Sequence, residues 1–159
     1  MSRTILVAAL ASWLTLTGAA GLAQAQGRRA LSPEQQVDQW YRQYLGRSVD
    51  QAGLDRWAND LRDGVAWQKV LGGILGSREY YRLKGGTYPR YVQGLHLDVL
   101  GQPPSRLEMR RAMDRLDQPY DNWKEAEEAR AAFATDLLER RESHPGQRQR
   151  SLARLRPGG

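Results

Sequence analysis

An apolar stripe with helical spacing recurs along this chain, and it constrains the fold more than any other feature. In its first occurrence the large apolar residues follow one another at intervals that place them on one face of a helix. These residues are Val37, Trp40, Tyr41, Tyr44 and Leu45. Ser32 and Pro33 supply a helix start before the stripe, and Gly46 supplies a stop after it. The sequence therefore predicts a helix that buries this face.

The rest of the middle of the chain shows the same type of pattern. Further helical segments are expected over 54–61, 66–75, 92–100, 105–116 and 123–142, with a short capped turn from Ser77 to Gly85. The fold class predicted from these patterns is all-α, a compact bundle of about five to six short helices.

The pattern also repeats with a shift of 55 residues. This shift places Val37 on Val92 and carries the Leu-Gly stop at Gly46 onto the Leu-Gly stop at Gly101. The next stripe matches as well, with Leu61 on Leu116. A coincidence of stripe, stop, loop length and second stripe indicates internal duplication. We therefore expect two related helical units, over 32–86 and over 87–142, with a groove between them as the binding surface. The second unit is the more degenerate.

The first residues have the three parts of a secretory signal. Arg3 is followed by an apolar run and then by Ala23-Gln24-Ala25, with small residues where a signal peptidase needs them. Residues 1–25 are predicted to be a signal peptide cleaved after Ala25, and 26–31 a short arm. The alternative is an uncleaved membrane anchor, although polar residues and glycines dilute the second half of the run. The chain has no cysteine, which excludes a lipid anchor on a cysteine thiol and disulfides.

The charge of the chain is unevenly distributed. The formal net charge is +6, yet residues 30–138 carry fifteen Lys/Arg against sixteen Asp/Glu. The segment 143–159 has too little apolar content to pack and is predicted to be a disordered basic tail. Its arginines are Arg148, Arg150, Arg154 and Arg156. It is interpreted either as an electrostatic arm for acidic polymers or as a solubilising tail. Export makes nucleic acid an unexpected partner.

One stretch of the first unit has a recognisable signature. It runs Tyr-Arg-Gln-Tyr-Leu-Gly-Arg over 41–47, continues with Asp50, Gly53, Leu54, Trp57 and Leu61, and ends with Ser-Arg-Glu-Tyr over 77–80. This signature resembles DUF4214, a bacterial domain of unknown function, and is similar to the helical repeats of phycobilisome linker proteins. The resemblance implies helical units, often repeated, in exported or surface-associated proteins without established catalytic chemistry.

The signature residues have a structural interpretation. They are Leu45, Gly46, Arg47, Asp50, Gly53, Trp57, Ser77, Glu79 and Tyr80. Arg47 and Asp50 are expected to pair or cap across a turn, Gly53 to allow close backbone approach, and Trp57 to fill the space between helices. The alternative is a calcium site at Asp50 and Asp55, but calcium takes six to eight oxygen ligands and this loop offers few. No metal site and no cofactor are predicted.

The search for catalytic patterns gives nothing. There are two histidines, and His96 lies on an apolar helical stripe while His144 lies in the tail. No nucleophile elbow, phosphate loop or zinc-protease helix is present. We therefore expect a protein that is not an enzyme.

Two hypotheses of function follow. The leading one is an exported scaffold or protein-interaction module of the periplasm or cell surface, with an envelope or extracellular protein as partner. The alternative is a binder of acidic envelope or extracellular polysaccharide. Its candidate ligand surface is an aromatic and basic cluster next to Tyr80, formed by Tyr81, Arg82, Lys84, Tyr88, Arg90 and Tyr91. Core packing with cations at the edge is the competing interpretation of that cluster. After cleavage the chain is not expected to span a membrane.

Overall fold

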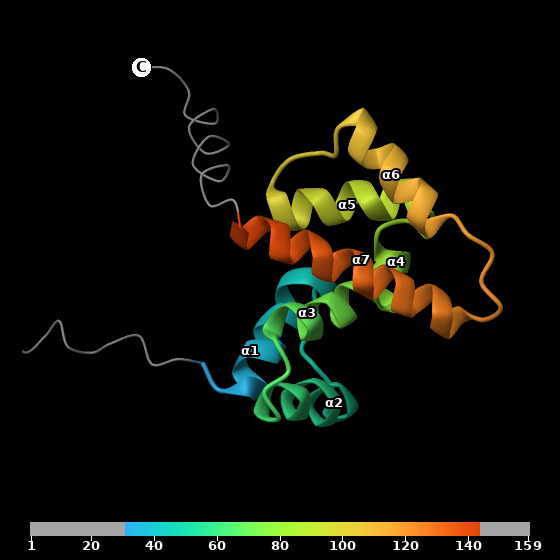
Figure 1. The fold of residues 1–159 in the computed structure, drawn as a ribbon. Helices are drawn as coiled ribbons and strands as arrows, with labels where there is room; N and C mark the ends of the chain where they lie inside the picture. The colour runs from blue at the N-terminus through green and yellow to red at the C-terminus, as the bar shows by residue number, and fades with distance from the viewer. Residues whose placement is uncertain (1–30, 144–159) are drawn as a thin grey trace, which may run out of the picture. The chain divides into compact units, whose positions relative to one another are not determined.

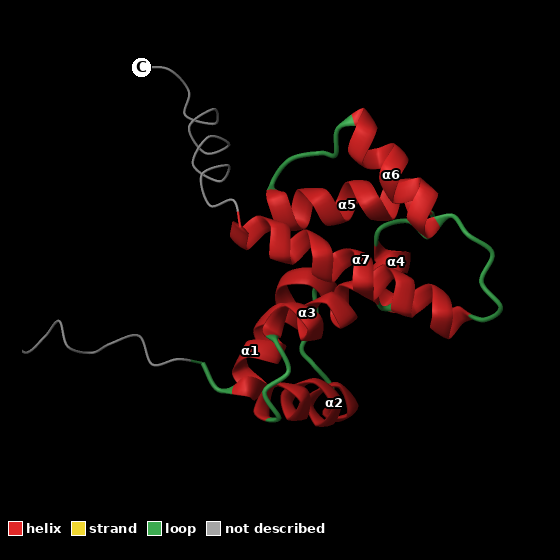
Figure 2. Cartoon of the chain, viewed as in Figure 1, coloured by secondary structure: helices red, strands yellow, loops and turns green. Residues whose placement is uncertain are grey.

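The computed structural model describes residues 31–143, in which every regular element is helical (Figures 1 and 2). The elements are α1 (Pro33–Trp40), a π-helical segment η1 (Tyr41–Leu45), α2 (Gln51–Arg62), α3 (Trp67–Gly76), α4 (Arg78–Leu83), α5 (Tyr88–Leu100), α6 (Arg106–Leu116) and α7 (Trp123–Ser143). The all-α fold is confirmed. The described part holds seven α-helices, because the capped turn predicted at Ser77 continues as the six-residue helix α4.

The helices begin where the capping residues predict. Ser32 before α1 and Ser105 before α6 each form a capping box, with Gln35 and Glu108 as the reciprocal partners. Asp50 caps α2 by accepting a hydrogen bond from the backbone N–H of Gly53 at 2.8 Å. These local contacts explain why the starts of these helices could be read from the sequence.

The two predicted units have corresponding helices. Gly46 ends η1 and Gly101 ends α5 with nearly the same left-handed backbone, φ being 72° in both. The caps at Asp50 and Ser105 that open the next helices are again 55 residues apart. The units differ after that, because α3 and α4 are separated at Ser77 whereas α7 continues over the equivalent length. The origin of the two units by duplication stays a prediction.

The units are joined by the packing of α3 on α7. Gly72 and Gly76 of α3 lie against Thr135 and Ala131 of α7. A Cβ at position 76 would come within 2.4 Å of the backbone nitrogen of Ala131, so only glycine permits this approach. Close backbone contact therefore fills this junction. The binding groove predicted between the two units stays a prediction.

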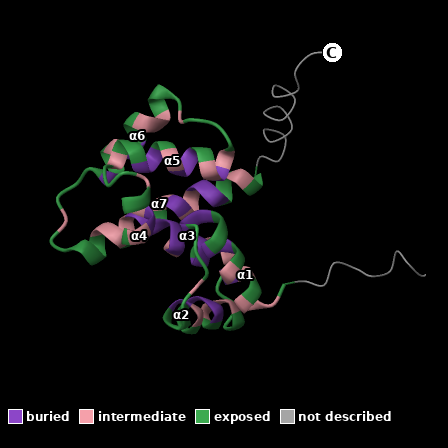
Figure 3. Cartoon of the chain, turned by 180° about the vertical axis from the view of Figure 1, so that it is seen from behind, coloured by how far each residue is buried: buried purple, intermediate pink, exposed green. Residues whose placement is uncertain are grey.

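Every described helix and η1 contribute buried residues to the core, and many of these residues lie on α3, α5 and α7 (Figure 3). It also contains one charged side chain, Arg130. Its Nε donates to the carbonyl oxygen of Gly76 at 2.9 Å, at the C-terminal end of α3, and its guanidinium lies 4.7 Å from the ring centroid of Tyr81. A cation is favourable at this end of a helix, so Arg130 ties α7 to the end of α3.

Several predictions fall on residues that the structure does not describe. The signal peptide over 1–25, nearly all of the arm over 26–31 and the basic tail from residue 144 lie outside residues 31–143. Within the described range, none of the helices has the length and apolar content that crossing a bilayer requires.

Candidate functional site

Arg47 is at the centre of a first set of contacts among the signature residues. The Arg47 guanidinium donates to both carboxylate oxygens of Glu79 on α4, at 2.6 and 2.7 Å. It also donates to the carbonyl oxygen of Ser48 and lies 5.0 Å from the ring centroid of Tyr41. The hydrogen bond with Arg47 lowers the pKa of Glu79, so the pair stays ionised well below neutral pH. This pair fixes the loop after Gly46 to α4.

A second set of contacts closes the junction between η1 and α2. The indole N–H of Trp57 donates to the hydroxyl of Tyr41 at 3.1 Å, and both side chains are buried. A Cβ on Gly53 would lie 2.8 Å from the same hydroxyl and 2.7 Å from Val49, so a larger residue at position 53 would force the two helices apart. Trp57 in turn packs on Gly73 of α3.

The remaining signature residues have equally local roles. Leu45 is buried, and Ser77 caps α4 by accepting from the backbone N–H of Tyr80. Tyr80 is fully buried and its hydroxyl donates to Asp98 of α5 at 2.8 Å. These contacts support the structural interpretation of the signature. Asp50 and Asp55 are each held by a neighbour on α2, and no cluster with metal-ligand character occurs within 31–143.

The predicted aromatic ligand surface is wrong at Tyr91. This residue is fully buried, and its hydroxyl donates to the carbonyl oxygen of Arg130, because α7 covers it. Tyr81 and Tyr88 are half-buried and pack against each other with ring centroids 5.6 Å apart. Lys84 forms an ion pair with Asp98 at 2.7 Å. Only Arg82 and Arg90 of the predicted cluster are exposed, so most of it serves packing.

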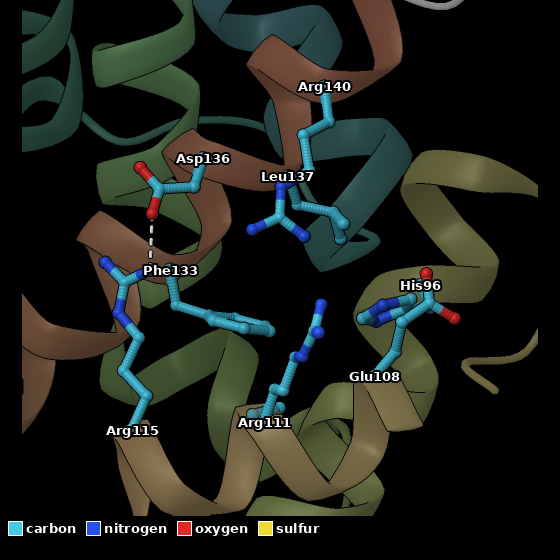
Figure 4. A pocket seen from close by; sticks show the side chains of 9 residues that line it. His96, Glu108, Arg111, Arg115, Phe133, Asp136, Leu137 and Arg140 are labelled. Atoms are coloured by element: carbon cyan, nitrogen blue, oxygen red, sulfur yellow. Dashed lines mark hydrogen bonds and ion pairs between the residues drawn. The ribbon is translucent and has the colours of Figure 1, made fainter. Parts of the chain in front are cut away.

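The second unit carries a solvent-open recess between α5, α6 and α7 (Figure 4). Its volume is about 150 Å³, and it is lined by His96, Glu108, Arg111, Ala112, Arg115, Phe133, Asp136, Leu137 and Arg140. Figure 4 shows the side chain of Arg111 reaching from α6 into the space between Phe133 and His96. We refer to this feature as the arginine recess.

The charges of the arginine recess are partly neutralised within it. Arg115 forms an ion pair with Asp136 across α6 and α7. Glu108 is held by the capping box at Ser105, and the hydrogen bonds from Ser105 lower its pKa. Arg111, in contrast, makes no hydrogen bond or ion pair with any residue of the described range. Three arginines face two carboxylates, so the lining carries a formal excess of one positive charge.

His96 forms the buried wall of the arginine recess. Its Nδ1 lies 2.9 Å from the carbonyl oxygen of Val92, and burial lowers its pKa, so the ring is neutral near pH 7. A carbonyl only accepts, so the proton of the neutral ring is on Nδ1 and Nε2 carries a lone pair. Nε2 has no partner among the described residues, yet it is not an enclosed unsatisfied atom. It is therefore open to the recess.

The sequence does not predict this recess. It predicts a semi-buried structural role for His96, which agrees with the burial of this residue, and it indicates no binding role for the other residues of the lining. Two local patterns in the sequence belong to this recess. Arg111 and Arg115 are four residues apart on α6, and Phe133, Asp136, Leu137 and Arg140 share one face of α7. That these two faces meet is a tertiary fact that neither helix encodes alone.

A comparison with models of known protein families finds a match to part of the chain. Residues 16–84 match the model of the family described as "Domain of unknown function (DUF4214)". The match starts inside the predicted signal peptide and ends at the C-terminus of α4, so it contains the whole signature. No curated protein and no solved structure matches the chain. The predicted relation to phycobilisome linkers stays a prediction. The match supports a DUF4214-type domain over residues 16–84, the part of the chain that contains the signature.

Proposed function

We propose that this chain is an exported, non-catalytic module that binds another protein in the periplasm or at the cell surface. The observation that carries the proposal is the arginine recess, where Arg111 faces solvent without a partner in the described range. Leu107, one helical turn before Arg111 on α6, is 52% exposed. Arginine is enriched in protein interfaces and among the residues that contribute most to binding, and Leu107 adds exposed apolar area beside it.

The state of the polar residues in the recess favours binding over catalysis. A general acid or base must be able to exchange a proton with a substrate. Asp136 is engaged by Arg115, and Glu108 is engaged by Ser105. No hydroxyl or thiol is among the side chains that line the recess. Both carboxylates are thus engaged, and the open Nε2 of His96 has no hydroxyl or thiol in the lining to activate. These features support a site that holds a ligand without transforming it.

The proposal that the chain is exported depends on the sequence of its first 25 residues. Fusion of the full chain to a C-terminal epitope tag, followed by cell fractionation and N-terminal sequencing, tests it. We expect the tagged protein in the periplasm or medium with Gln26 as its first residue. A tagged protein that stays in the cytoplasm and keeps Met1 would contradict the localisation and with it the class of partner.

The binding part is tested by affinity capture from envelope extract of the source organism. The baits are the wild-type chain, Arg111→Ala and Arg110→Ala, the last being an exposed arginine on the same helix that does not line the recess. We expect a defined protein on the wild-type and Arg110→Ala baits and its loss from the Arg111→Ala bait. Equal capture of the protein by all three baits would show that the recess is not its binding site.

Binding of an acidic polysaccharide is the second candidate. It would use the exposed Arg82 and Arg90 beside the half-buried Tyr81 and Tyr88. Burial of Tyr80 and Tyr91 removes two of the rings that would stack on sugars, so this candidate has less support. Recovery of glycan in place of protein in the capture experiment would favour it.

A further inference from the structure

The arginine recess contains an arrangement of charges that specifies the kind of group it receives. The guanidinium of Arg111 enters the recess without a partner in the described range. Arg140 of α7 adds a second positive charge to the lining. A guanidinium that faces a partly enclosed space is a strong donor for an oxyanion, and it binds planar carboxylates through two parallel hydrogen bonds.

We infer that the arginine recess is a carboxylate-binding site, that Arg111 is its anchoring donor, and that its ligand is a glutamate or aspartate side chain of an acidic protein segment. This inference rests on the proposed function, because it names the chemistry of the protein partner.

The charge balance favours a carboxylate over a phosphate. The lining carries a formal excess of one positive charge, which a single carboxylate neutralises. A phosphate monoester carries a charge between −1.5 and −2 near neutral pH. Its second charge would face the carboxyl groups of Glu108 and Asp136. The ion pair of Asp136 with Arg115 also leaves Arg115 less able to serve a second anion.

The size and the walls of the recess favour a side chain over a sugar. A volume of about 150 Å³ corresponds to roughly five water molecules at about 30 Å³ each. This space accommodates a carboxylate with its methylene groups. Phe133, the aromatic ring of the lining apart from His96, is flanked by the Arg115 guanidinium at 5.8 Å and by the imidazole of His96 at 6.3 Å. Its contacts are those of a packed wall, whereas sugars stack on open aromatic faces.

The surroundings of the recess fit a peptide. The open Nε2 of His96 accepts a hydrogen bond, so it suits a peptide N–H or a bridging water next to the bound carboxylate. Leu107 on the adjacent turn of α6 offers an apolar contact to a neighbouring residue of the same segment. The two features together serve a ligand that presents an acid, an amide donor and an apolar group within a short distance.

The test is a titration of the purified full chain with three probes at low and at high salt. The probes are hexaglutamate with blocked ends, hexaglutamine with the same blocks, and hexagalacturonate. Affinity is measured calorimetrically, and the ring signals of His96 are followed by NMR, with His144→Asn used to assign them. The proteins compared are wild type, Arg111→Ala, Arg111→Lys and the control Arg110→Ala.

We expect hexaglutamate to bind wild type and Arg110→Ala, to shift the His96 signals and to bind more weakly at high salt, while hexaglutamine does not bind. Arg111→Ala should weaken hexaglutamate binding by at least about tenfold, the loss expected for a hydrogen bond to a charged group. The affinity of Arg111→Lys for hexaglutamate should lie between those of wild type and Arg111→Ala, because lysine keeps the positive charge but lacks the planar guanidinium that donates two parallel hydrogen bonds. Thermal unfolding should be unchanged in all three variants, since neither Arg110 nor Arg111 has a partner in the described range.

Equal affinity of Arg111→Ala and Arg110→Ala for hexaglutamate, or binding that leaves the His96 signals in place, would overturn the inference. Tighter binding of hexagalacturonate than of hexaglutamate would overturn the assignment to an acidic protein segment. The titration uses no cell extract, so failure to capture a protein partner and failure of the carboxylate site are separate results.

Discussion

Arg47 and Arg111 are both exposed arginines, yet their surroundings differ. Arg47 donates to Glu79 through two hydrogen bonds and to the carbonyl oxygen of Ser48, so its fork is occupied within the chain. Arg111 has no such contact in the described range and points into the arginine recess. Sequence alone gives both residues the same charge and the same length, and only their neighbours separate a structural role from a binding role.

The buried histidine gives a prediction at this scale. Burial lowers the pKa of His96 below its ordinary value of 6.5. The unfolded chain therefore binds more protons than the folded chain between the folded pKa and 6.5, and stability is fully present above 6.5 and falls as the pH drops through this window. Urea unfolding at about pH 7.5 and about pH 5.5 should show this loss in wild type, and a smaller one in His96→Gln. The same pH dependence in both proteins would show that His96 is not its source.

At the scale of elements, the fold depends on how closely α3 approaches α7. Gly72 and Gly76 lie against the backbone of Ala131 and Thr135, and Arg130 closes the end of α3. Glycine lowers the intrinsic helix propensity of α3, so its helical state depends on this packing. The short turn at Ser77 then starts α4, which Arg47 and Tyr80 attach to the rest of the domain.

Replacement of Gly76 tests this packing. Gly76→Ala would place a Cβ within 2.4 Å of a backbone atom of α7. We expect a loss of about 1–3 kcal/mol in the free energy of unfolding, measured in urea, because the two helices must move apart. Gly94→Ala on α5 is the matched control, since the three atoms nearest to the added Cβ all belong to the side chain of Lys84 and none to a backbone. It should change stability by less, because alanine also improves helix propensity by about 0.5–1 kcal/mol. Equal losses in both variants would contradict the account of the junction.

The elements show what sequence can and cannot predict. Caps and stops depend on residues three or four positions apart, and so the helix starts at Ser32, Asp50 and Ser105 and the stops at Gly46 and Gly101 could be predicted. The change from α-helix to π-helix at Tyr41 was not predicted, because the apolar stripe continues through it without a break. The pairing of α3 with α7 was not predicted either, since contacts between distant segments leave no local pattern.

The same limit applies to the candidate sites. The signature residues are close in sequence, and three of them have the roles that the sequence predicts. Asp50 caps a helix, Gly53 allows close packing and Trp57 is buried. The tyrosine cluster was misjudged because four tyrosines near one another look alike in sequence, whereas α7 covers Tyr91 and leaves Tyr88 at the edge. The arginine recess needs three helices at once and therefore could not be found before the fold.

For the molecule as a whole, the two units have different tasks in this account. The first unit carries the DUF4214 signature, whose residues hold η1, α2 and α4 together. The second unit lacks that signature and carries the arginine recess between α5, α6 and α7. The second unit has the capping box of Ser105 and Glu108 at the position where the first unit has Asp50. The start of α6 therefore corresponds to the start of α2, although the second unit has no equivalent of the Arg47–Glu79 pair. The unit that departs from the signature is thus the one proposed to bind.

The most direct measurement of this division is the affinity of two variants, Arg47→Ala and Arg111→Ala, for blocked hexaglutamate, with the thermal unfolding of each recorded alongside. Both substitutions remove one exposed arginine, so the change in net charge is the same. The account predicts that Arg47→Ala unfolds at a lower temperature and keeps wild-type affinity, whereas Arg111→Ala unfolds as wild type does and loses at least about tenfold in affinity. Loss of affinity in Arg47→Ala together with wild-type affinity in Arg111→Ala would contradict this division of roles. It would place the binding surface at the signature residues of the first unit.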